Sequence, residues 1–480
     1  MSAGGRGAPL GAGPPVRLGK TRLRGTQRST RATGRYPDGR TGAIAAIDAL
    51  ARAGDDAGMG TRRVVGCMTG TSIDALDAAL VSIEGAGLGL RAQFMRGQTR
   101  PLGDLGTRLR RLAAQDPMPA GQIAGLARDF ALLHIEVVRE LLGSESADLI
   151  AVHGQTVFHA PPLSWQLFSP APLAHALQAP VVCDLRAADL AAGGQGAPIT
   201  PLADFVLFRD EAETRAVVNL GGFCNYTLLP AGRPLGGSGD LETWAGAVRG
   251  GDISACNQLL DALARALFAA PFDEDGRHAR AGRMQSGPRY ELLTLLRAQS
   301  QAGRALGTGD ELSAWIAQHR DACSGDDLAR TACEAVATVI VESIAAVAQH
   351  SGVGPVRRYL LAGGGARNPV LREALAARAA TASGGPGARP RATPSSGAAG
   401  APVVVTDAFG VPANYREAAA MAVLGALCQD GVPITLPQVT GVPAPAPVAG
   451  VWVYPERGAV IDCDRQPGQA HSGERHAPHR

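Results

Sequence analysis

Lysine is almost absent from this chain of 480 residues: Lys20 is the only one, and arginine supplies the other 45 of the 46 basic side chains. A Walker-type phosphate loop needs a lysine after its glycines, and protein-kinase folds need a strand lysine on the phosphates. Pyridoxal and other Schiff-base chemistry also needs a lysine. Because Lys20 lies in a segment of disordered-looking composition, the sequence argues against all of these classes.

Paired cysteines and long apolar runs are also missing. The eight cysteines are scattered without a CxxC pair, which argues against a zinc site or a disulfide framework and for a reducing compartment. We therefore expect a cytoplasmic protein. The best candidate for a membrane span, residues 331–350, is interrupted by Glu334 and Glu342. It predicts a core helix, so we expect no membrane partner.

Basic charge is concentrated in residues 1–58, which carry ten Lys/Arg against four acids. The remainder has 36 basic and 39 acidic residues, a net charge of −3, and so lacks the basic surface typical of nucleic-acid binding. The first 58 residues cannot bury enough apolar surface to fold alone. We expect a disordered tail or a start codon assigned too early, with Met59 as the true first residue. A transit peptide is the less favoured alternative.

From Arg63 onward the pattern is that of an α/β protein. Strands are expected at 64–68, 75–83, 90–99, 149–152, 164–168 and 181–185, with a helix over 123–141. At Ala216 a strand, a glycine turn and a strand recur at 216–220 and 224–229, followed by helices near 255–268, 287–301 and 327–349 and a strand at 359–362.

This repetition predicts a duplicated, two-lobed α/β fold with a ligand cleft between the lobes. We expect an N-terminal lobe over 63–214 and a C-terminal lobe over 215–462. Residues 379–401 are rich in Gly, Pro, Ser and Ala, which predicts a flexible insertion, and 463–480 predict a disordered tail.

The first motif with chemical content is a strand that runs into a turn of glycine and hydroxyl residues, Gly66-Cys67-Met68-Thr69-Gly70-Thr71-Ser72-Ile73-Asp74-Ala75-Leu76-Asp77. Glycine between hydroxyl residues lets successive backbone N–H groups face one anion, and a nearby carboxylate can hold water on Mg²⁺. An ordinary hairpin turn has the same composition. Both interpretations stay open on this motif alone.

Two further motifs follow predicted strands. His153-Gly154-Gln155-Thr156 comes after a strand end, where open α/β sheets place ligands, and offers neutral donors and acceptors for sugar hydroxyls or an amide. A capped loop is the alternative. In the segment 184–198, Asp189 is well placed to act as a base and Arg186 to grip a carboxylate, before the glycine-rich stretch 193–196. A salt bridge beside a flexible loop explains the same residues.

Glycine turns appear twice more. Asn219-Leu220-Gly221-Gly222-Phe223-Cys224-Asn225 places a second turn between strands. Gly363-Gly364-Gly365 follows a strand and precedes a helix, an arrangement that suits a nucleotide lying against backbone.

Together, and in the same order, these five segments resemble the anhydro-N-acetylmuramic acid kinase family. Gly66–Asp77 resembles its opening phosphate loop, of the form GxMSGTSxDGxD, and Gly363–Pro369 and Glu417-Ala418 match further blocks. The likeness covers roughly residues 63–430. It implies an actin-like ATPase or sugar-kinase fold and a homodimer. It also supports Met59 as the start, because the family begins shortly before its first motif.

The resemblance implies a reaction in peptidoglycan recycling. ATP phosphorylates O6 of 1,6-anhydro-N-acetylmuramic acid while water opens the anhydro bridge at C1, giving N-acetylmuramic acid 6-phosphate. Asp189 would be the general base that activates the water. Hydrolysis of a glycosidic bond normally takes one carboxyl as acid and one as base. Since the γ-phosphoryl group captures the leaving O6, one aspartate suffices.

The resemblance also implies the ligands of the site, with ATP and Mg²⁺ as cofactors and Asp74 holding Mg²⁺ through water. The implied ATP-binding residues are Gly70, Thr71, Ser72, Ile73, Asp74, Ala75, Asp77, Gly221, Gly222, Gly363, Gly364 and Gly365. The implied sugar-binding residues are His153, Gln155, Thr156, Arg186, Gly194, Gln195, Asp252 and Asn257, with Arg186 on the lactyl carboxylate.

Three departures from the family pattern bear on substrate and activity. Thr69 stands where the family has Ser, and Ala75 stands where it has Gly, which would tighten the turn if a positive φ is needed. In the expected loop 251–257, Asp252 and Asn257 match a family DTGPGN block, but its Thr, both glycines and Pro are lost. The alternatives are therefore a kinase for another anhydro or amino sugar, or a catalytically inactive sugar- or ATP-binding protein.

Overall fold

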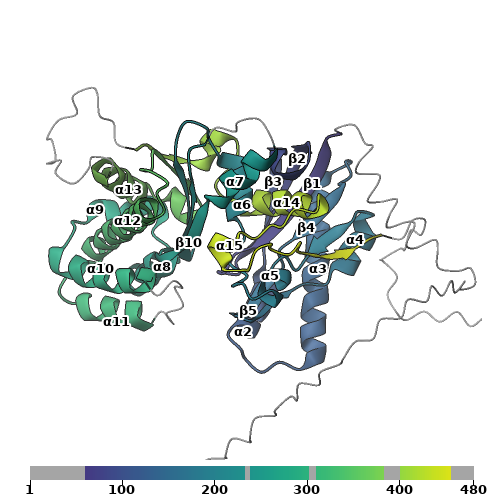
Figure 1. Cartoon of the computed structure of the whole chain (residues 1–480). Coiled ribbons are helices and arrows are strands. Elements are labelled where there is room, and N and C mark those ends of the chain that lie inside the picture. The colour runs from purple at the N-terminus through teal and green to yellow at the C-terminus, as the bar shows by residue number, and fades with distance from the viewer. Residues whose placement is uncertain (1–59, 233–237, 302–309, 383–400, 456–480) are drawn as a thin grey trace, which may run out of the picture. The chain divides into compact units, whose positions relative to one another are not determined.

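The computed structural model describes residues 60–232, 238–301, 310–382 and 401–455 (Figure 1). The predicted tails at 1–58 and 463–480 and most of the predicted insertion 379–401 lie outside these residues. One part of the insertion prediction is wrong. Residues 379–382 form the last turn of helix α13, where Ala379 is buried against the core.

The first sheet has six strands in the order β13-β7-β4-β1-β2-β3. β1 pairs antiparallel with β2 and parallel with β4, β2 pairs antiparallel with β3, and β4 pairs parallel with β7. The strands are β1 Arg62–Thr69, β2 Ala75–Glu84, β3 Arg91–Pro101, β4 Leu149–Val152, β7 Val181–Cys183 and β13 Val451–Val453. A separate hairpin consists of β5 Gln155–Ala160 and β6 Leu163–Leu167.

The second sheet has five strands in the order β10-β9-β8-β11-β12. β8 pairs antiparallel with β9 and parallel with β11, β9 pairs antiparallel with β10, and β11 pairs parallel with β12. The strands are β8 Arg215–Leu220, β9 Phe223–Leu229, β10 Arg249–Ala255, β11 Arg358–Ala362 and β12 Val403–Val405.

The two sheets share one topology. Counted from its own first strand, each half places its strands in the order third, second, first, fourth, fifth, with the hairpin antiparallel and the last two strands parallel. Each also begins with a strand, a glycine turn and a strand. The predicted duplicated α/β fold is therefore confirmed by strand order and direction.

Helices cover both faces of the sheets. The α-helices are α2 Gly103–Ala113, α3 Ala120–Leu142, α4 Pro170–Leu177, α5 Ala187–Ala191, α6 Pro201–Phe208, α7 Ser238–Gly246, α8 Asn257–Phe268, α9 Arg277–Ala281, α10 Ser286–Gln301, α11 Asp310–His319, α12 Gly325–His350, α13 Pro369–Ala382, α14 Arg416–Gln429 and α15 Pro437–Thr440. Short 3₁₀ turns lie at Gly87–Gly89, Glu274–Gly276, Gly364–Arg367 and Thr406–Phe409.

Alternate residues of the central strands face different cores, as the two-residue period of a strand requires. Val65 packs with α3 on one side of the first sheet, and Val218 packs with α12 on one side of the second. Val64 and Val217 point the other way, into a shared core that also contains α6 and α14. Helices α6 and α14 thus join the two sheets.

The C-terminal part of the chain returns to the first sheet. Helix α14 packs on β1, β2 and β4, and strand β13 pairs antiparallel with β7. A Cβ atom on Gly66 would lie 2.0 Å from the carbonyl oxygen of Ala418, so the close approach of α14 to β1 depends on that glycine. The predicted lobe 215–462 therefore requires a correction at its C-terminal end, where Trp452 packs on the shared core.

Helix α12 is the one helix of the described residues that is long and apolar enough to cross a membrane. Two thirds of its most apolar stretch is buried inside the protein. Its apolar side chains fill the core of the second half, among them Val336, Val339 and Ile340.

The prediction of a loop at residues 251–257 is wrong. Residues 249–255 form strand β10, which pairs with β9 across a bulge between Asp252 and Ser254. Ile253 and Ser254 are buried, and Gln299 accepts a hydrogen bond from Ala255 N at 3.0 Å. A single Ile among Gly, Asp and Ser gives no recognisable alternation of apolar and polar residues. The sequence therefore did not predict this strand, which is stabilised by burial of its side chains.

Candidate active site

The turn between β1 and β2 presents polar groups outward. Ile73 N donates to Gly70 O at 3.2 Å, which closes the turn. Ile73 is buried and has φ of +56°, a left-handed conformation that is uncommon for a β-branched residue and costs about 1–3 kcal/mol. Backbone strain of this kind gathers at functional sites. Thr71, Ser72 and Asp74 are exposed on this turn.

Ala75 carries none of the strain that its departure from the family pattern suggested. It begins β2 and is not among the described residues with positive φ. Asp77, two residues on, accepts a hydrogen bond from Thr99 Oγ1 at 2.6 Å. Burial raises the pKa of Asp77, while the Thr99 hydrogen bond and the charge of Arg367 act against the rise. Arg367 belongs to the second half, so Asp77 interacts electrostatically with that half.

The second glycine turn meets the first. A Cβ atom on Gly222 would lie 3.5 Å from Thr71 Oγ1. The backbone carbonyls of Gly221 and Gly222 accept hydrogen bonds from Asn257 N at 3.0 Å and Cys256 N at 2.9 Å, at the start of α8. Hydrogen bonds from the first backbone N–H groups of α8 therefore fix this turn.

The third glycine turn joins the same place. Gly363 has φ of +79°, and a Cβ atom on it would lie 2.7 Å from Asn219 Oδ1. Asn257 Nδ2 donates to Leu220 O at 2.9 Å, and a Cβ atom on Gly365 would lie 2.7 Å from Asn257 Oδ1. The structure therefore brings all three glycine turns together, with Asn257 packed among them.

A second carboxylate interacts electrostatically with the first turn. Burial raises the pKa of Asp261, on α8, to about 6; the charge of Arg265 acts against the rise and the charge of Asp74 adds to it. Asp74 is itself exposed and lies 3.5 Å from Arg110 Nη1. Asp74 and Asp261 come from different halves of the fold and interact across the joined turns.

The buried His153 is paired with the half-buried Arg186. His153 Nδ1 lies 2.7 Å from Gly154 O, and its Nε2 lies 3.1 Å from Arg186 Nε and 2.9 Å from Nη2. Arg186 can only donate, so Nε2 accepts and the proton belongs on Nδ1. Burial and the Arg186 charge lower the pKa of His153 to about 3. With both ring nitrogens occupied, His153 holds Arg186 rather than facing outward.

Asp189 is completely buried in α5 and accepts two hydrogen bonds. Gly196 N donates to Oδ2 at 2.6 Å, and Thr440 Oγ1 donates to Oδ1 at 2.7 Å. A Cβ atom on Gly194 would lie 2.2 Å from Oδ2, so only glycine lets the loop wrap this carboxylate. Arg186 Nη1 donates to Gly196 O at 2.6 Å, which links Asp189 to the His153–Arg186 pair.

The remaining predicted sugar residues differ in their placement. Gln155 is buried, its Nε2 donates to Thr156 O at 3.1 Å, and its Oε1 has no partner among the described residues. Thr156 Oγ1 accepts from Gln166 on the hairpin. The side chain of Gln195 is exposed, while its N–H donates to Thr440 O at 2.8 Å. Asp252 lies half-buried on β10, opposite Asn225.

The two groups of predicted residues are neighbours. His153 N donates to Cys67 O at 3.1 Å, and Thr69 Oγ1 donates to Gly154 O at 3.4 Å, so the His153 segment lies beside the first turn. Burial raises the pKa of Glu417; the charges of Asp77 and Asp204 add to the rise and those of Arg416 and Arg186 oppose it. The pKa of Glu417 is therefore affected by a residue from each group, Asp77 and Arg186.

Sequence reasoning missed several side chains of this site. Thr440, Asp261 and Arg367 were not predicted, and Glu417 was noted only as part of a family block. No local pattern identifies Thr440, because its contact with Asp189 spans 251 residues of chain. Asp261 could have been found, since it lies one helical turn after Asn257.

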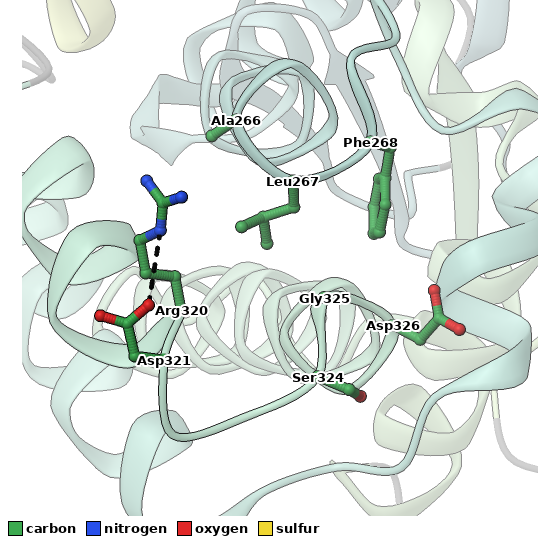
Figure 2. Close-up of a pocket in the computed structure, with 8 residues that line it drawn as sticks. All are labelled: Ala266, Leu267, Phe268, Arg320, Asp321, Ser324, Gly325 and Asp326. Atoms are coloured by element: carbon green, nitrogen blue, oxygen red, sulfur yellow. Dashed lines mark ion pairs between the residues drawn. The ribbon is translucent and has the colours of Figure 1, made fainter.

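A separate hollow of about 370 Å³ lies between the end of α8, the residues that follow α11 and the start of α12 (Figure 2). Figure 2 shows Arg320 and Asp321 paired with each other at its edge, at 3.8 Å. None of the predicted site residues lines this hollow.

The duplicated sheets and their joined glycine turns agree with the duplicated α/β fold that the sequence predicted. A family model described as anhydro-N-acetylmuramic acid kinase matches residues 62–387. The chain belongs to this family. An anhydro-N-acetylmuramic acid kinase of Salinibacter ruber is 33% identical over 414 residues, which cover 82% of this chain and 96% of that protein.

Other relatives have a similar degree of identity, and one solved structure is more distant. The anhydro-N-acetylmuramic acid kinases of Synechococcus sp. and Bordetella parapertussis are 34% and 35% identical, each over 82% of this chain and 99% and 96% of their own length. A solved ROK family glucokinase from Streptomyces griseus, in complex with glucose and AMPPNP, is 14% identical with a TM-score of 0.33 over 76% of this chain and 99% of that chain.

Proposed function

We propose that this protein is an ATP-dependent kinase for 1,6-anhydro-N-acetylmuramic acid, which it phosphorylates at O6 while water opens the anhydro ring. The observation that carries the proposal is that the predicted ATP-binding residues and the predicted sugar-binding residues lie next to each other. Three glycine turns meet at one place, and the His153–Arg186–Gly196–Asp189 network lies beside them. Family membership supplies the substrate. ATP dependence and a role in peptidoglycan recycling support a cytoplasmic location.

The joined glycine turns are proposed to bind ATP. Thr71 and Ser72 are exposed hydroxyl donors on the first turn, and Gly222 approaches Thr71 without a side chain in between. Phosphoryl transfer depends mainly on positioning and charge neutralisation. Backbone N–H groups, hydroxyls and Mg²⁺ can provide both, which explains how the site functions without a lysine.

Mg²⁺ fits the carboxylates of this site. It prefers oxygen ligands and usually keeps several waters, so a carboxylate often holds it indirectly. Asp74 is exposed on the first turn, and burial together with the charge of Asp74 raises the pKa of Asp261, on α8, to about 6. A divalent cation near Asp261 would favour the ionised form of its carboxyl group. We expect Asp74→Asn and Asp261→Asn to need more Mg²⁺ for half-maximal activity; an unchanged Mg²⁺ requirement in both variants would contradict this assignment.

The sugar is proposed to lie against Arg186 and Gln155. Arg186 is held by His153 and Gly196 and supplies the positive charge that a lactyl carboxylate needs. Gln155 Oε1 is a buried acceptor without a partner in the described chain, and such an atom costs about 1–3 kcal/mol unless a ligand or water satisfies it. We expect Arg186→Gln to raise KM for the sugar but not for ATP; an unchanged KM would contradict this role.

Asp189 is proposed to take the proton from the attacking water. The water oxygen bonds to C1, the C1–O6 bond breaks, and O6 bonds to the γ-phosphorus as ADP leaves. One water proton goes to Asp189, and the other stays on the new C1 hydroxyl. A carboxylate has about four lone-pair positions, and Gly196 and Thr440 use two of them, one on each oxygen. Because Asp189 is completely buried, the loop at 193–195, in which Gly194 is also buried, must shift to admit the water.

The experiment that tests this role compares Asp189→Asn with the wild type. The substitution keeps the shape of the side chain but removes the base, so kcat should fall by about 10²–10⁴-fold. Binding of ATP and of the sugar, measured by calorimetry, should persist. An active Asp189→Asn enzyme would contradict the assignment. Loss of both binding activities would mean that Asp189 acts in folding instead.

A second candidate is a kinase for another anhydro or amino sugar. The observation in its favour is the segment at the end of β10. There Ile253, Ser254, Ala255 and, just after the strand, Cys256 replace most of the family block between Asp252 and Asn257. Because Ile253, Ser254 and Ala255 are buried in the sheet, the change alters packing behind the site. Comparing kcat/KM for anhydro sugars with and without the lactyl group distinguishes the two candidates.

A further inference from the structure

The hydroxyl of Thr440 contacts the carboxylate that the proposed reaction needs. Thr440 Oγ1 lies 2.7 Å from Asp189 Oδ1, and both residues are buried, at 1% and 0% exposure. Thr440 belongs to α15, beyond residue 387, where the match to the family model ends. We propose that Thr440 is a positioning residue that orients Asp189 for proton transfer. This inference rests on the proposed function of Asp189.

The direction of the hydrogen bond follows from the chemistry of the two groups. A hydroxyl has one proton to donate, and an ionised carboxylate can only accept. Thr440 Oγ1 lies 3.4 Å from the carbonyl oxygen of Leu436, much farther than from Asp189. The single proton therefore belongs in the bond to Asp189 Oδ1.

Thr440 is itself held firmly in the fold. Its N–H donates to Leu436 O at 3.0 Å within α15, and its carbonyl accepts from Gln195 N at 2.8 Å. Gln438 Nε2, on the same short helix, donates to Ala245 O at 2.9 Å, and α15 packs against β10. One residue thus fixes the carboxylate through its hydroxyl and the loop at 193–196 through its carbonyl.

The two donors leave Asp189 a restricted set of orientations. Gly196 N holds Oδ2, and Thr440 Oγ1 holds Oδ1, so the plane of the carboxylate is fixed by one bond to each oxygen. A general base works only when its lone pair meets the proton in a productive geometry. Without the hydroxyl, only the Gly196 bond remains, and the carboxylate can rotate about it.

A double-mutant cycle tests this role. Thr440→Val replaces the hydroxyl with a methyl group of similar size, and we expect kcat to fall by up to about 10²-fold, an effect that a small misplacement of a catalytic group can have. KM for ATP and for the sugar should change little. Thr440→Ser keeps the hydroxyl and should recover most of kcat. In an Asp189→Asn background, Thr440→Val should cause no further loss, measured over long incubations by mass spectrometry.

The cycle separates a positioning role from a structural one. An asparagine at 189 can accept from Gly196 N through its carbonyl oxygen and donate to Thr440 Oγ1 through its amide. A structural contribution of the Thr440 hydroxyl would therefore be lost in both backgrounds. Equal losses of kcat in the two backgrounds would therefore overturn the inference, as would full activity of Thr440→Val. If Thr440→Val does not fold, Thr440→Ala takes its place in the cycle. A wild-type enzyme without turnover would overturn the proposed function itself, whereas the outcomes above overturn only the role of Thr440.

Discussion

At the scale of single residues, a chain of hydrogen bonds connects His153, Arg186, Gly196 and Asp189. His153 accepts from Arg186, Arg186 donates to Gly196 O, and the N–H of Gly196 donates to Asp189. Each buried polar group is satisfied by the next, which is the condition for a stable polar network in a core. A change at one member should therefore reach Asp189.

Gly194→Ala tests how tightly Asp189 is enclosed. A Cβ atom at this position would lie 2.2 Å from Asp189 Oδ2, so the loop or the carboxylate must move. We expect kcat to fall by about 10²-fold, since small misplacements of catalytic groups have effects of that size. Gly125→Ala is the control, because a Cβ atom on Gly125, in α3, would meet no atom within 4 Å, and the change should be neutral or slightly stabilising. Equal kcat for the two variants would contradict the described enclosure.

The glycine turns and the Asp189 segment were predictable from sequence because their chemistry is local. Gly70, Gly221 and Gly363 each follow a strand directly, and Asp189 comes shortly after another strand. Thr440 was not predictable, because Pro437-Gln438-Val439-Thr440 has no feature that identifies a partner in α5. Such a contact is set by tertiary packing, which the local pattern does not contain.

At the scale of elements, helices α6 and α14 are joined by a buried ion pair. Arg416 Nε donates to Asp204 Oδ1 at 2.7 Å, and Arg416 Nη2 also contacts the same carboxylate. Thr227 on β9 donates to Asp204 Oδ2 at 2.6 Å, and Arg416 Nη2 donates to Thr200 Oγ1 at 3.1 Å. The pair therefore connects α14, α6 and the second sheet inside the shared core.

Asp204→Asn should strongly destabilise the fold, because it leaves the Arg416 charge buried without a counter-ion. Removing one partner of a buried pair typically costs about 3–5 kcal/mol in the free energy of unfolding. Glu342→Gln is the control, since its partner Arg297 is 45% exposed and an exposed pair is worth about 0–1 kcal/mol. Urea denaturation measures both. A loss for Asp204→Asn no larger than that for Glu342→Gln would contradict a structural role for the pair.

Element prediction succeeded where periodicity was strong. The strand at 149–152 and the hairpin strands around both glycine turns were confirmed, as were α3 and α12. Strand β10 was missed because Gly250, Gly251 and Asp252 favour a turn by composition, whereas the pairing with β9 and the burial of Ile253 decide otherwise. Strand β13 was missed because a three-residue edge strand carries too little pattern to recognise.

At the scale of the whole described fold, the sequence predicted the duplication but not how the chain closes. Both halves repeat one strand order, and the repeated pattern of strand, glycine turn and strand makes this visible in the sequence. The return of α14 and β13 to the first sheet is fixed by contacts between residues far apart in the sequence, chiefly the burial of α14 between the sheets. The catalytic proposal depends on it, since Thr440 lies on this returning segment.

Acid sensitivity should follow from two buried histidines. Burial lowers the pKa of His134 to about 4 and, with the charge of Arg186, that of His153 to about 3. The unfolded chain binds these protons at its ordinary pKa of about 6.5, before the folded protein does. Their contribution to stability is therefore complete above about pH 6.5 and is lost as the pH falls toward the folded pKa values, by about 1.4 kcal/mol per pH unit for each residue.

His134→Gln tests this prediction without disturbing the site. The pH dependence of the free energy of unfolding between about pH 6 and 4 should become shallower by about 1.4 kcal/mol per unit. His350→Gln is a matched control: His350 Nδ1 lies 2.7 Å from Ala346 O, as His134 Nδ1 lies 2.8 Å from Phe130 O, but His350 is exposed. Identical slopes for His134→Gln and the wild type would contradict the prediction.

The central claim is that one active site transfers a phosphoryl group to O6 and directs water to C1. The most direct measurement incubates the protein with Mg-ATP and 1,6-anhydro-N-acetylmuramic acid in water enriched in heavy oxygen, and analyses the product by mass spectrometry. We expect a 6-phosphorylated reducing sugar with the heavy atom at C1, and about 10²–10⁴-fold less of it from Asp189→Asn in the same time. A product that keeps its anhydro ring, or no product although ATP binds, would contradict the claim.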